Sequence, residues 1–395
     1  MDDFPMLLEV RTPLNSLDVA ASLSQEFVQS AAKPDAKAGV SEYEIERLRD
    51  SELLSLIVPK EYGGIGATWV EALKIVYALS KANHLIGQLY GNHLILTTLA
   101  HICGTLEQKE RYYQYTAGNH CFWANAIDTW DTTLKLTSEG DHFRLNGAKT
   151  FNPVVAAADL RVFSVWQEGV SEPFFVILPK DRPGVFSSHN WNNVDLGEAD
   201  SVSFRFHNVI VEKGEIFNSP NFCDRAFTTL QGIITQLTKT YVSLGIGQSA
   251  LEVLQEYRKT ISQSPSTSGG DSATQDTYTL GHYSDLWLEL TTAIRLADYA
   301  TELIQAAWEK EFRLTSEERG EVASAVFSAE AFAARISLEI TTHILKCTNN
   351  PPTGTTYNLE RYGQELSSFG GVSMPWQGVA QPWKLTYFPS QKVPC

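Results

Sequence analysis

The feature that most constrains the fold of this chain is a set of three long helical patterns in its C-terminal half. Apolar residues recur at the spacing of an α-helix over residues 227–261, 277–312 and 316–346. Helices of about 30 residues are roughly 45 Å long, which is more than one domain core covers. We therefore expect a bundle of long helices that buries its remaining apolar surface against other subunits, as a homodimer or homotetramer.

Two shorter blocks precede the predicted bundle. Residues 13–118 show helical periodicity, with Ser41 and Glu44 spaced as a capping box and Pro59 at the end of a helix. Short runs rich in β-branched and aromatic residues follow, and these predict strands. The runs are residues 121–127, 132–137, 143–146, 160–166, 174–178 and 201–211.

The order of these blocks predicts a mainly α, α+β protein with three domains. A helical domain spans residues 1–118, a small antiparallel β domain spans 119–213, and the helix bundle spans 214–395. The linker at residues 262–276 is rich in serine, glycine and threonine, as is typical of a connection between helices.

Composition excludes several classes of partner. The net charge is −15 and lysine and arginine do not cluster, which argues against nucleic acid as a ligand. The five cysteines are scattered without metal-ligand spacing, so no metal site is predicted. Residues 1–12 do not resemble a signal peptide, and no apolar run is long enough to cross a membrane. We therefore expect a soluble, cytoplasmic protein that binds a small apolar substrate.

Several sequence segments resemble the acyl-CoA dehydrogenase superfamily along the whole chain. VPKEYGGIG at residues 58–66 and FRLNGAKTF at residues 143–151 carry the general resemblance. Six further segments are similar to the dibenzothiophene monooxygenase branch, whose members use reduced flavin to oxygenate nitrogen or sulfur. These are QLYGNH (88–93), WANA (123–126), QEYRKT (255–260), DSATQDTY (271–278), LTSEERGE (314–321) and LERY (359–362).

The resemblance implies FMN or FAD between the sheet and the bundle, but this chain departs from the family at the flavin positions. Gln263 and residues 349–352 stand where relatives have phosphate-binding arginines, and residues 367–373 lack the histidine that relatives place near the flavin. Pro153 replaces a hydroxyl residue that faces the ring, and it offers neither an N–H nor a hydroxyl. Charge-assisted bonds to a phosphate each contribute about 1.5–3 kcal/mol, so losing them predicts weak flavin binding.

These departures lead to the prediction that the chain has lost its cofactor. The predicted function is then a non-redox cyclisation, isomerisation or dehydration of an apolar natural-product intermediate, performed by positioning and a few polar groups. One alternative is a loop misalignment, or a phosphate site rebuilt from Lys149, Arg258 or Lys259. In that case the chain remains an FMN- or FAD-dependent monooxygenase acting on S, N or C of a hydrophobic small molecule. A non-catalytic ligand-binding protein is the third possibility.

Four residues are candidates for catalysis. His93 and Tyr90 lie on a predicted helix next to the positions that face the substrate in the family, and both side chains can transfer a proton. Asn125 keeps the family identity and can donate and accept through its amide. Asp128 follows the same strand and is a possible acid or base. A structural role is the commoner one for a lone helical histidine, and solvation is commoner for a turn carboxylate.

Eight further residues are predicted to contact the substrate. Gln88 and Asn92 align with the histidine and tyrosine that face the substrate in relatives, and the aromatic side chains flank the predicted cavity, although sheet aromatics are as often core. The full set is Gln88, Asn92, Trp123, Trp130, Pro153, Phe369, Ser373 and Trp376.

Overall fold

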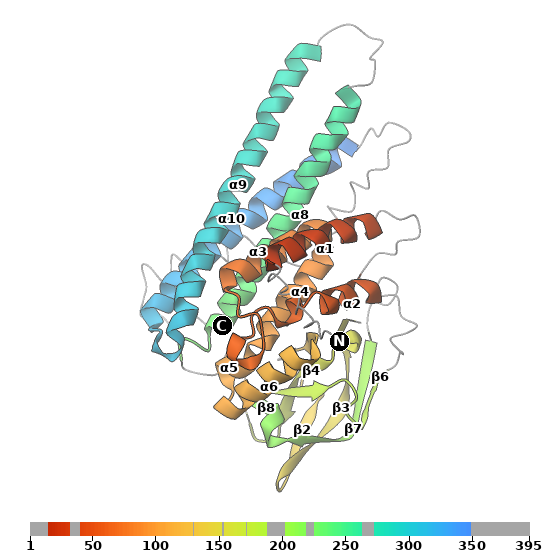
Figure 1. Cartoon of the computed structure of the whole chain (residues 1–395), viewed down its shortest axis with the longest axis vertical. Coiled ribbons are helices and arrows are strands. Elements are labelled where there is room, and N and C mark those ends of the chain that lie inside the picture. The colour runs from red at the N-terminus through yellow and green to blue at the C-terminus, as the bar shows by residue number, and fades with distance from the viewer. Residues whose placement is uncertain are drawn as a thin grey trace, which may run out of the picture.

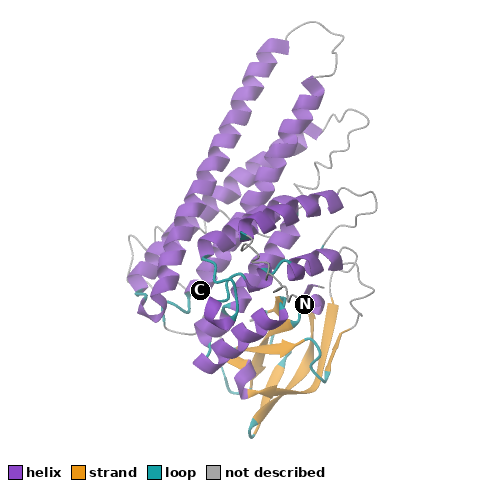
Figure 2. Cartoon of the chain, viewed as in Figure 1, coloured by secondary structure: helices purple, strands orange, loops and turns teal. Residues whose placement is uncertain are grey.

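A computed structural model describes residues 15–31, 40–128, 130–151, 154–170, 172–187, 202–218, 225–262 and 272–348. The sheet lies at one end of the molecule, the N-terminal helices occupy the middle, and the long C-terminal helices extend away at the other end (Figure 1). Colouring by secondary structure separates the strands from the helices along this long axis (Figure 2). The predicted mainly α, α+β architecture is confirmed. The predicted domain boundaries at residues 118/119 and 213/214 remain predictions.

Several of the N-terminal helices begin at side-chain caps. The predicted capping box is confirmed, since the Ser41 N–H donates to Glu44 Oε2 at 2.8 Å and the Glu44 N–H donates to Ser41 Oγ at 3.3 Å. A second box joins Thr105 and Gln108 at the start of another helix. The helices are α1 (Ser16–Ala31), α2 (Glu42–Asp50), α3 (Trp69–Ala82), α4 (His84–Thr97), α5 (Leu99–Cys103) and α6 (Leu106–Asn119), with short 3-10 turns η1 (Leu53–Ser55) and η2 (Lys60–Tyr62).

Eight strands form one sheet, in the order β6-β7-β3-β2-β4-β5-β8, with β1 paired to β4. They are β1 (Trp123–Ala126), β2 (Lys135–Glu139), β3 (His142–Phe151), β4 (Leu160–Gln167), β5 (Phe174–Pro179), β6 (Val185–Ser187), β7 (Val202–Glu212) and β8 (Ile216–Asn218). The sheet is mixed rather than antiparallel as predicted, because β4 runs parallel to both β1 and β2. Strand patterns do not encode pairing direction, and this is why the sequence alone did not show it.

Strands β1 and β2 share one edge of β4, lying end to end along it. β1 pairs with residues 160–163 of β4 and β2 pairs with residues 166–167, while β5 covers the opposite edge. β2 also pairs with β3, but only as far as Asn146. The second half of β3, from Gly147 to Phe151, therefore pairs with β7 on one side and extends past β2 on the other.

Three long helices form the C-terminal bundle, as predicted. They are α8 (Leu230–Ser262), α9 (Ser272–Lys310) and α10 (Ser316–Thr348), with a 3-10 turn η6 (Glu311–Arg313) between the last two. α8 contacts α10 and α9 within the bundle and α3 and α4 of the N-terminal helices. The Tyr241 hydroxyl donates to Asp298 Oδ1 at 2.9 Å and so fastens α8 to α9. No helix in the described ranges is long and apolar enough to cross a membrane.

The contact between α4 and α8 depends on a glycine. A Cβ at Gly91 would lie 2.3 Å from Thr238 Cγ2, far inside van der Waals contact. Thr238 cannot easily turn away, because it is β-branched and its hydroxyl donates to Ile234 O within α8. The close approach of these two helices therefore requires glycine at position 91.

Gly91→Ala is expected to lower the free energy of unfolding by about 1–3 kcal/mol, as overpacked core substitutions do. Gly281→Ala is the matched control. Gly281 lies within α9 on its exposed surface, and a Cβ there meets no neighbour. That change should raise stability by roughly 0.5–1 kcal/mol through helix propensity. Urea unfolding of both variants measures the difference, and equal effects would contradict the packing argument.

Candidate functional site

Strand β1 has one paired edge and one open edge. Backbone groups of successive residues point to opposite edges of a strand, and Phe122 O accepts from Leu160 N on the β4 side. The N–H groups of Trp123, Asn125 and Ile127 therefore point to the other side. Among the described residues the Asn125 backbone has no hydrogen-bond partner there, and its half-buried side-chain amide has none either. This edge is the candidate site, because it presents unpaired donors and acceptors.

His93 occupies the first position of that open edge. The Trp123 N–H donates to His93 Nδ1 at 3.1 Å, and His93 Nε2 lies 2.8 Å from the carbonyl oxygen of Leu54. Since Nδ1 accepts a hydrogen bond in the neutral ring, Nε2 must carry the ring hydrogen and donate it to the carbonyl oxygen of Leu54. The ring is fully buried, with the Phe122 ring tilted against it at 5.9 Å between centroids. Burial lowers the pKa of His93 to about 4, so the imidazole is neutral at physiological pH.

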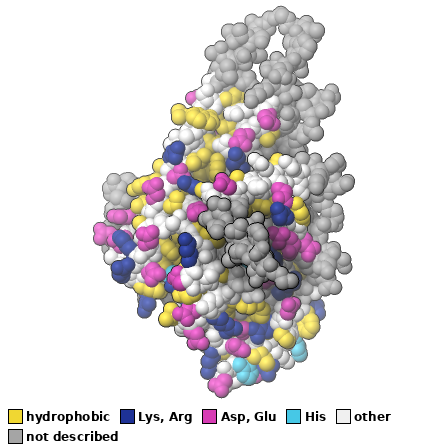
Figure 3. Space-filling model, viewed as in Figure 1, with side chains coloured by type: hydrophobic (Ala, Val, Ile, Leu, Met, Phe, Trp, Pro, Cys, Tyr) yellow, Lys and Arg dark blue, Asp and Glu magenta, His cyan; other side chains and the backbone are white. Residues whose placement is uncertain are grey.

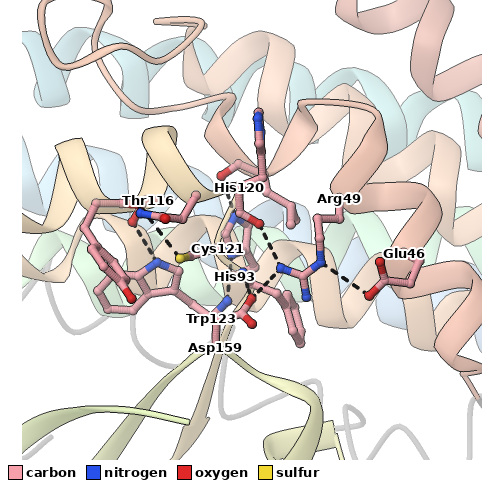
Figure 4. Close-up of polar contacts among 12 residues, drawn as sticks. Glu46, Arg49, His93, Thr116, His120, Cys121, Trp123 and Asp159 are labelled. Carbon is pink, nitrogen blue, oxygen red and sulfur yellow. Dashed lines mark hydrogen bonds and ion pairs between the residues drawn. The ribbon is translucent and has the colours of Figure 1, made fainter. Parts of the chain in front are cut away.

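An ion pair holds the other edge of the same strand (Figure 4). Arg49 Nη1 donates to Asp159 Oδ2 at 2.6 Å and to the carbonyl oxygen of His120 at 3.1 Å. The same Asp159 oxygen accepts the Phe122 N–H at 2.8 Å. Successive backbone N–H groups, of Phe122 and Trp123, are thus bound by side chains from opposite sides. The start of β1 is fixed relative to both α2 and α4.

A buried lysine fixes the segment that follows β1. Lys149 reaches from β3 and donates through Nζ to Asp128 O at 3.2 Å, with Asp131 Oδ2 at 3.4 Å. Ser164 Oγ also donates to Asp128 O at 2.9 Å and accepts the Asp128 N–H at 3.0 Å. Lys149 is only 6% exposed, and its ammonium group is committed to this segment. The hypothesis that Lys149 binds a phosphate is not supported by this geometry.

The structure places three predicted site residues in the interior of the protein. Tyr90 is fully buried and donates from its hydroxyl to Leu53 O at 3.0 Å, and burial raises its pKa well above the usual range. Trp123 is also fully buried, and its indole N–H donates to Thr116 Oγ1 at 2.9 Å. With His93, these side chains have structural partners. The predicted proton transfer by His93 and Tyr90 and the predicted substrate contact of Trp123 therefore have no support from this arrangement.

Other predicted residues lie nearer the surface. Gln88 and Asn92 are one turn apart and partly exposed on α4, and neither has a side-chain partner among the described residues. Asp128 is exposed, and its Oδ1 accepts the Trp130 N–H at 3.0 Å in a tight turn. Trp130 is 92% exposed. Pro153, Phe369, Ser373 and Trp376 lie outside the described residues, as do Gln263 and residues 349–352.

Sequence reasoning missed two residues that shape this region. Arg49 and Asp159 are far apart in the sequence and lie outside any motif, so nothing in the sequence indicated their contact. The role of Lys149 had a weak signal, because a lysine at a core position of a strand needs a partner. The turn that begins at Asp128 had one signal in the sequence, because aspartate is common at the first position of a turn.

A separate surface hollow lies away from β1. It has a volume of about 430 Å³ and lies between η2, the start of α3 and the end of α9. Lys60, Thr68, Gln305 and Trp308 are among its lining residues. The glycine-rich loop at residues 63–66 connects η2 to α3 beside this hollow.

Helices, a central sheet and a long helix bundle in this order define the acyl-CoA dehydrogenase class of fold. Residues 17–119 match the family described as acyl-CoA dehydrogenase, N-terminal domain. Methanesulfinate monooxygenase MsuC of Pseudomonas fluorescens has a similar structure, with a TM-score of 0.86 and 29% identity over 97% of this chain and 99% of that one. TdsC of Paenibacillus, solved with FMN and indole, has a TM-score of 0.84 at 24% identity over 96% and 98% of the two chains, which supports the fold alone.

Relatives in sequence identify the branch of this superfamily to which the chain belongs. Dibenzothiophene monooxygenase of Mycolicibacterium goodii is 32% identical over 89% of this chain and 88% of its own length. The probable FMNH2-dependent monooxygenase SfnC of Pseudomonas putida is 28% identical over 90% of both chains. The chain belongs to the dibenzothiophene monooxygenase branch of the acyl-CoA dehydrogenase superfamily.

These relatives overturn two predictions from the sequence. A flavin-independent cyclase, isomerase or dehydratase was predicted, but the relatives are named as monooxygenases and SfnC is named as FMNH2-dependent. The prediction that no cofactor is used is wrong for the same reason, and FMN is bound in a related structure. The error came from treating missing family side chains as a missing site. Backbone groups also bind ligands, and side-chain identities do not record them.

The described residues offer groups that fit the ring of a flavin. The pyrimidine edge of the ring carries one N–H donor and two carbonyl acceptors, and it needs both kinds of partner. The open edge of β1 supplies the backbone N–H and C=O of Asn125, and the Asn125 amide adds a further donor and acceptor. The side chains of Arg258 and Lys259 lie outside the described residues, as do Gln263 and residues 349–352.

The buried neutral state of His93 predicts a pH dependence of stability. The pKa is about 6.5 in the unfolded chain and about 4 in the folded protein, so the unfolded chain binds more protons between these values. Stability from this group is fully present above pH 6.5 and is lost as the pH falls to 4, by roughly 3 kcal/mol in all. Urea unfolding at pH 7 and pH 4 measures the loss of unfolding free energy in the wild type and in His93→Asn. The part of that loss due to His93, roughly 3 kcal/mol, should occur only in the wild type. A constant gap between the two proteins would contradict it.

Proposed function

We propose that this chain is a reduced-flavin-dependent monooxygenase that acts on S, N or C of a hydrophobic small molecule. The observation that carries the proposal is full-length similarity to named monooxygenases, with a match at 32% identity over 89% of the chain. The open edge of β1 supports it, because it offers the donors and acceptors that a flavin ring requires. Reduced flavin, when bound, supplies the two electrons that let dioxygen give one oxygen atom to the substrate and the other to water.

Side chains of this protein orient the reactants rather than take part in covalent chemistry. Asn125 would hold the cofactor ring through its backbone and its amide, and the fixed start of β1 keeps that group in place. Gln88 and Asn92 would contact the substrate, because they are the partly exposed amides on the helix that packs against β1. Neutral amides can bind a sulfur or nitrogen oxide through N–H groups without adding charge to an apolar site.

The segment after β1 is proposed as a wall of the substrate site. Trp130 lies five residues beyond Asn125 and is almost fully exposed, which leaves its indole face free to contact an aromatic ligand. Lys149 and Ser164 hold the backbone beneath it at Asp128. Asp128 lies beside Trp130 and remains a candidate for proton exchange with product water.

Oxygen transfer can be tested directly with the full chain. FMNH2 is supplied by a flavin reductase and NADH, with dibenzothiophene and indole as probes under labelled dioxygen. One labelled oxygen atom in the organic product is the expected result, and it should require FMNH2. If the protein neither binds FMNH2 under anaerobic conditions nor gives product with a panel of sulfur and nitrogen heterocycles, the proposal fails.

Asn125→Ala should weaken FMNH2 binding by about two- to tenfold, since it removes neutral hydrogen bonds worth about 0.5–1.5 kcal/mol. The matched control is Asn119→Ala, which removes an amide that is bonded to Tyr115 O at the end of α6. Anaerobic titration followed by tryptophan fluorescence measures both affinities. Equal affinities of the two variants for FMNH2 would show that the Asn125 side chain does not contact the flavin.

We also propose that the chain forms a homodimer or homotetramer through α9. Leu288, Leu296 and Tyr299 are exposed on this helix and recur at helical spacing along one face, and Trp287 is exposed next to Leu288 at the edge of that face. Figure 3 shows hydrophobic side chains gathered on the helical part of the face in view. An apolar stripe of this kind is typical of a subunit contact.

Light scattering of the purified protein is therefore expected to give the mass of a dimer or tetramer. Leu288→Glu should shift the mass toward that of the monomer, because burying a carboxylate in an apolar interface is costly. Leu106→Glu is the control, since Leu106 is equally exposed but lies on α6. A wild-type protein that is monomeric at micromolar concentration would contradict this part of the proposal.

A further inference from the structure

We infer that His93 is a positioning residue that sets the place of β1, and through it the cofactor-facing groups of Asn125. The inference rests on the proposed function, because it assigns the open edge of β1 to the flavin. His93 touches neither that edge at Asn125 nor the solvent. It acts through the backbone of Trp123, which lies two residues before Asn125 on the same edge.

The contacts of His93 connect three segments that are distant in the sequence. Its ring lies on α4, accepts a hydrogen bond from β1 through Nδ1, and donates one to η1 through Nε2. Both bonds lie in a dry interior, where an unpaired backbone group is costly. This ring therefore supplies the hydrogen bond that fixes β1 relative to α4, the helix that carries Gln88 and Asn92.

Few side chains other than a neutral histidine can make both contacts. The ring needs an acceptor facing the strand N–H and a donor facing the Leu54 carbonyl, on opposite sides of a flat group. An apolar residue would leave both backbone groups unpaired. Asparagine places its Oδ1 near the position of Nδ1, and glutamine places its Nε2 near the position of the ring Nε2. Each amide therefore reproduces one of the two bonds.

This difference separates positioning from a general structural role. His93→Asn keeps the acceptor for Trp123 and loses the donor to Leu54, whereas His93→Gln does the reverse. A purely structural role predicts that both variants lose stability and that β1 responds equally in both. A positioning role predicts that only His93→Gln disturbs β1. Thr97→Val is the control, since its hydroxyl is equally buried on α4 and bonds only to the carbonyl of His93.

The experiment uses the full-length protein and two readouts. Hydrogen exchange of the peptide covering residues 121–128 reports on β1 without any cofactor, and anaerobic titration with FMNH2 reports on the site. In His93→Gln, exchange at Trp123 and the FMNH2 dissociation constant should each rise by about tenfold. In His93→Asn and Thr97→Val, both should stay within about threefold of the wild type.

Each outcome has a definite meaning. Equal changes in the asparagine and glutamine variants, in both readouts, would overturn the inference. If His93→Gln does not fold, His93→Asn is compared with Thr97→Val, and faster exchange in residues 121–128 of the asparagine variant alone would overturn it. If the wild type does not bind FMNH2, the proposed function fails, and the exchange measurements alone decide whether His93 holds β1.

Discussion

The arrangement of this molecule around its candidate site depends on one constraint: a strand that pairs on one side must satisfy its other side by different means. Within the described part of the chain β1 pairs only with β4, so its outer N–H groups need partners inside a largely apolar interior. His93 satisfies the first of them, and Lys149 and Ser164 fix the backbone where the strand ends. Between these two points the edge stays open. The open edge is therefore held rigidly at both ends, which is what a ligand site built from backbone groups requires.

Charge is used sparingly in this arrangement. Asp159 binds both Arg49 and a strand N–H, so its carboxylate links α2 to the sheet. Lys149 is buried against carbonyl and hydroxyl oxygens together with Asp131. Both cations are thus committed to the framework, while the partly exposed side chains of Gln88, Asn92 and Asn125 are uncharged amides. An uncharged surface suits a hydrophobic substrate, because an apolar molecule does not have to compete with strongly hydrated groups.

The sequence predicted the fold far better than the site. Helical periodicity and a capping box located the long helices and the start of α2, because these signals are local. The parallel pairing of β1 and β4 was missed, since the pattern of a strand does not specify the direction of its neighbour. His93 and Tyr90 were predicted as proton donors from their chemistry, but burial and backbone partners decide what such groups do. The cofactor prediction failed because it equated changed side chains at aligned positions with the loss of a binding site, whereas the relative SfnC is named as FMNH2-dependent.

Helix α4 carries residues that hold the fold together on some faces and partly exposed residues on another. On α4, Gly91 contacts α8 and His93 contacts β1, so substitutions at these two positions act on the packing of the fold. Gln88 and Asn92 lie between these contacts on the partly exposed face, and no described side chain depends on them. Substitutions at these two positions can therefore alter which molecule is accepted without altering how the protein folds. Libraries limited to this pair would explore new substrates while leaving the architecture untouched.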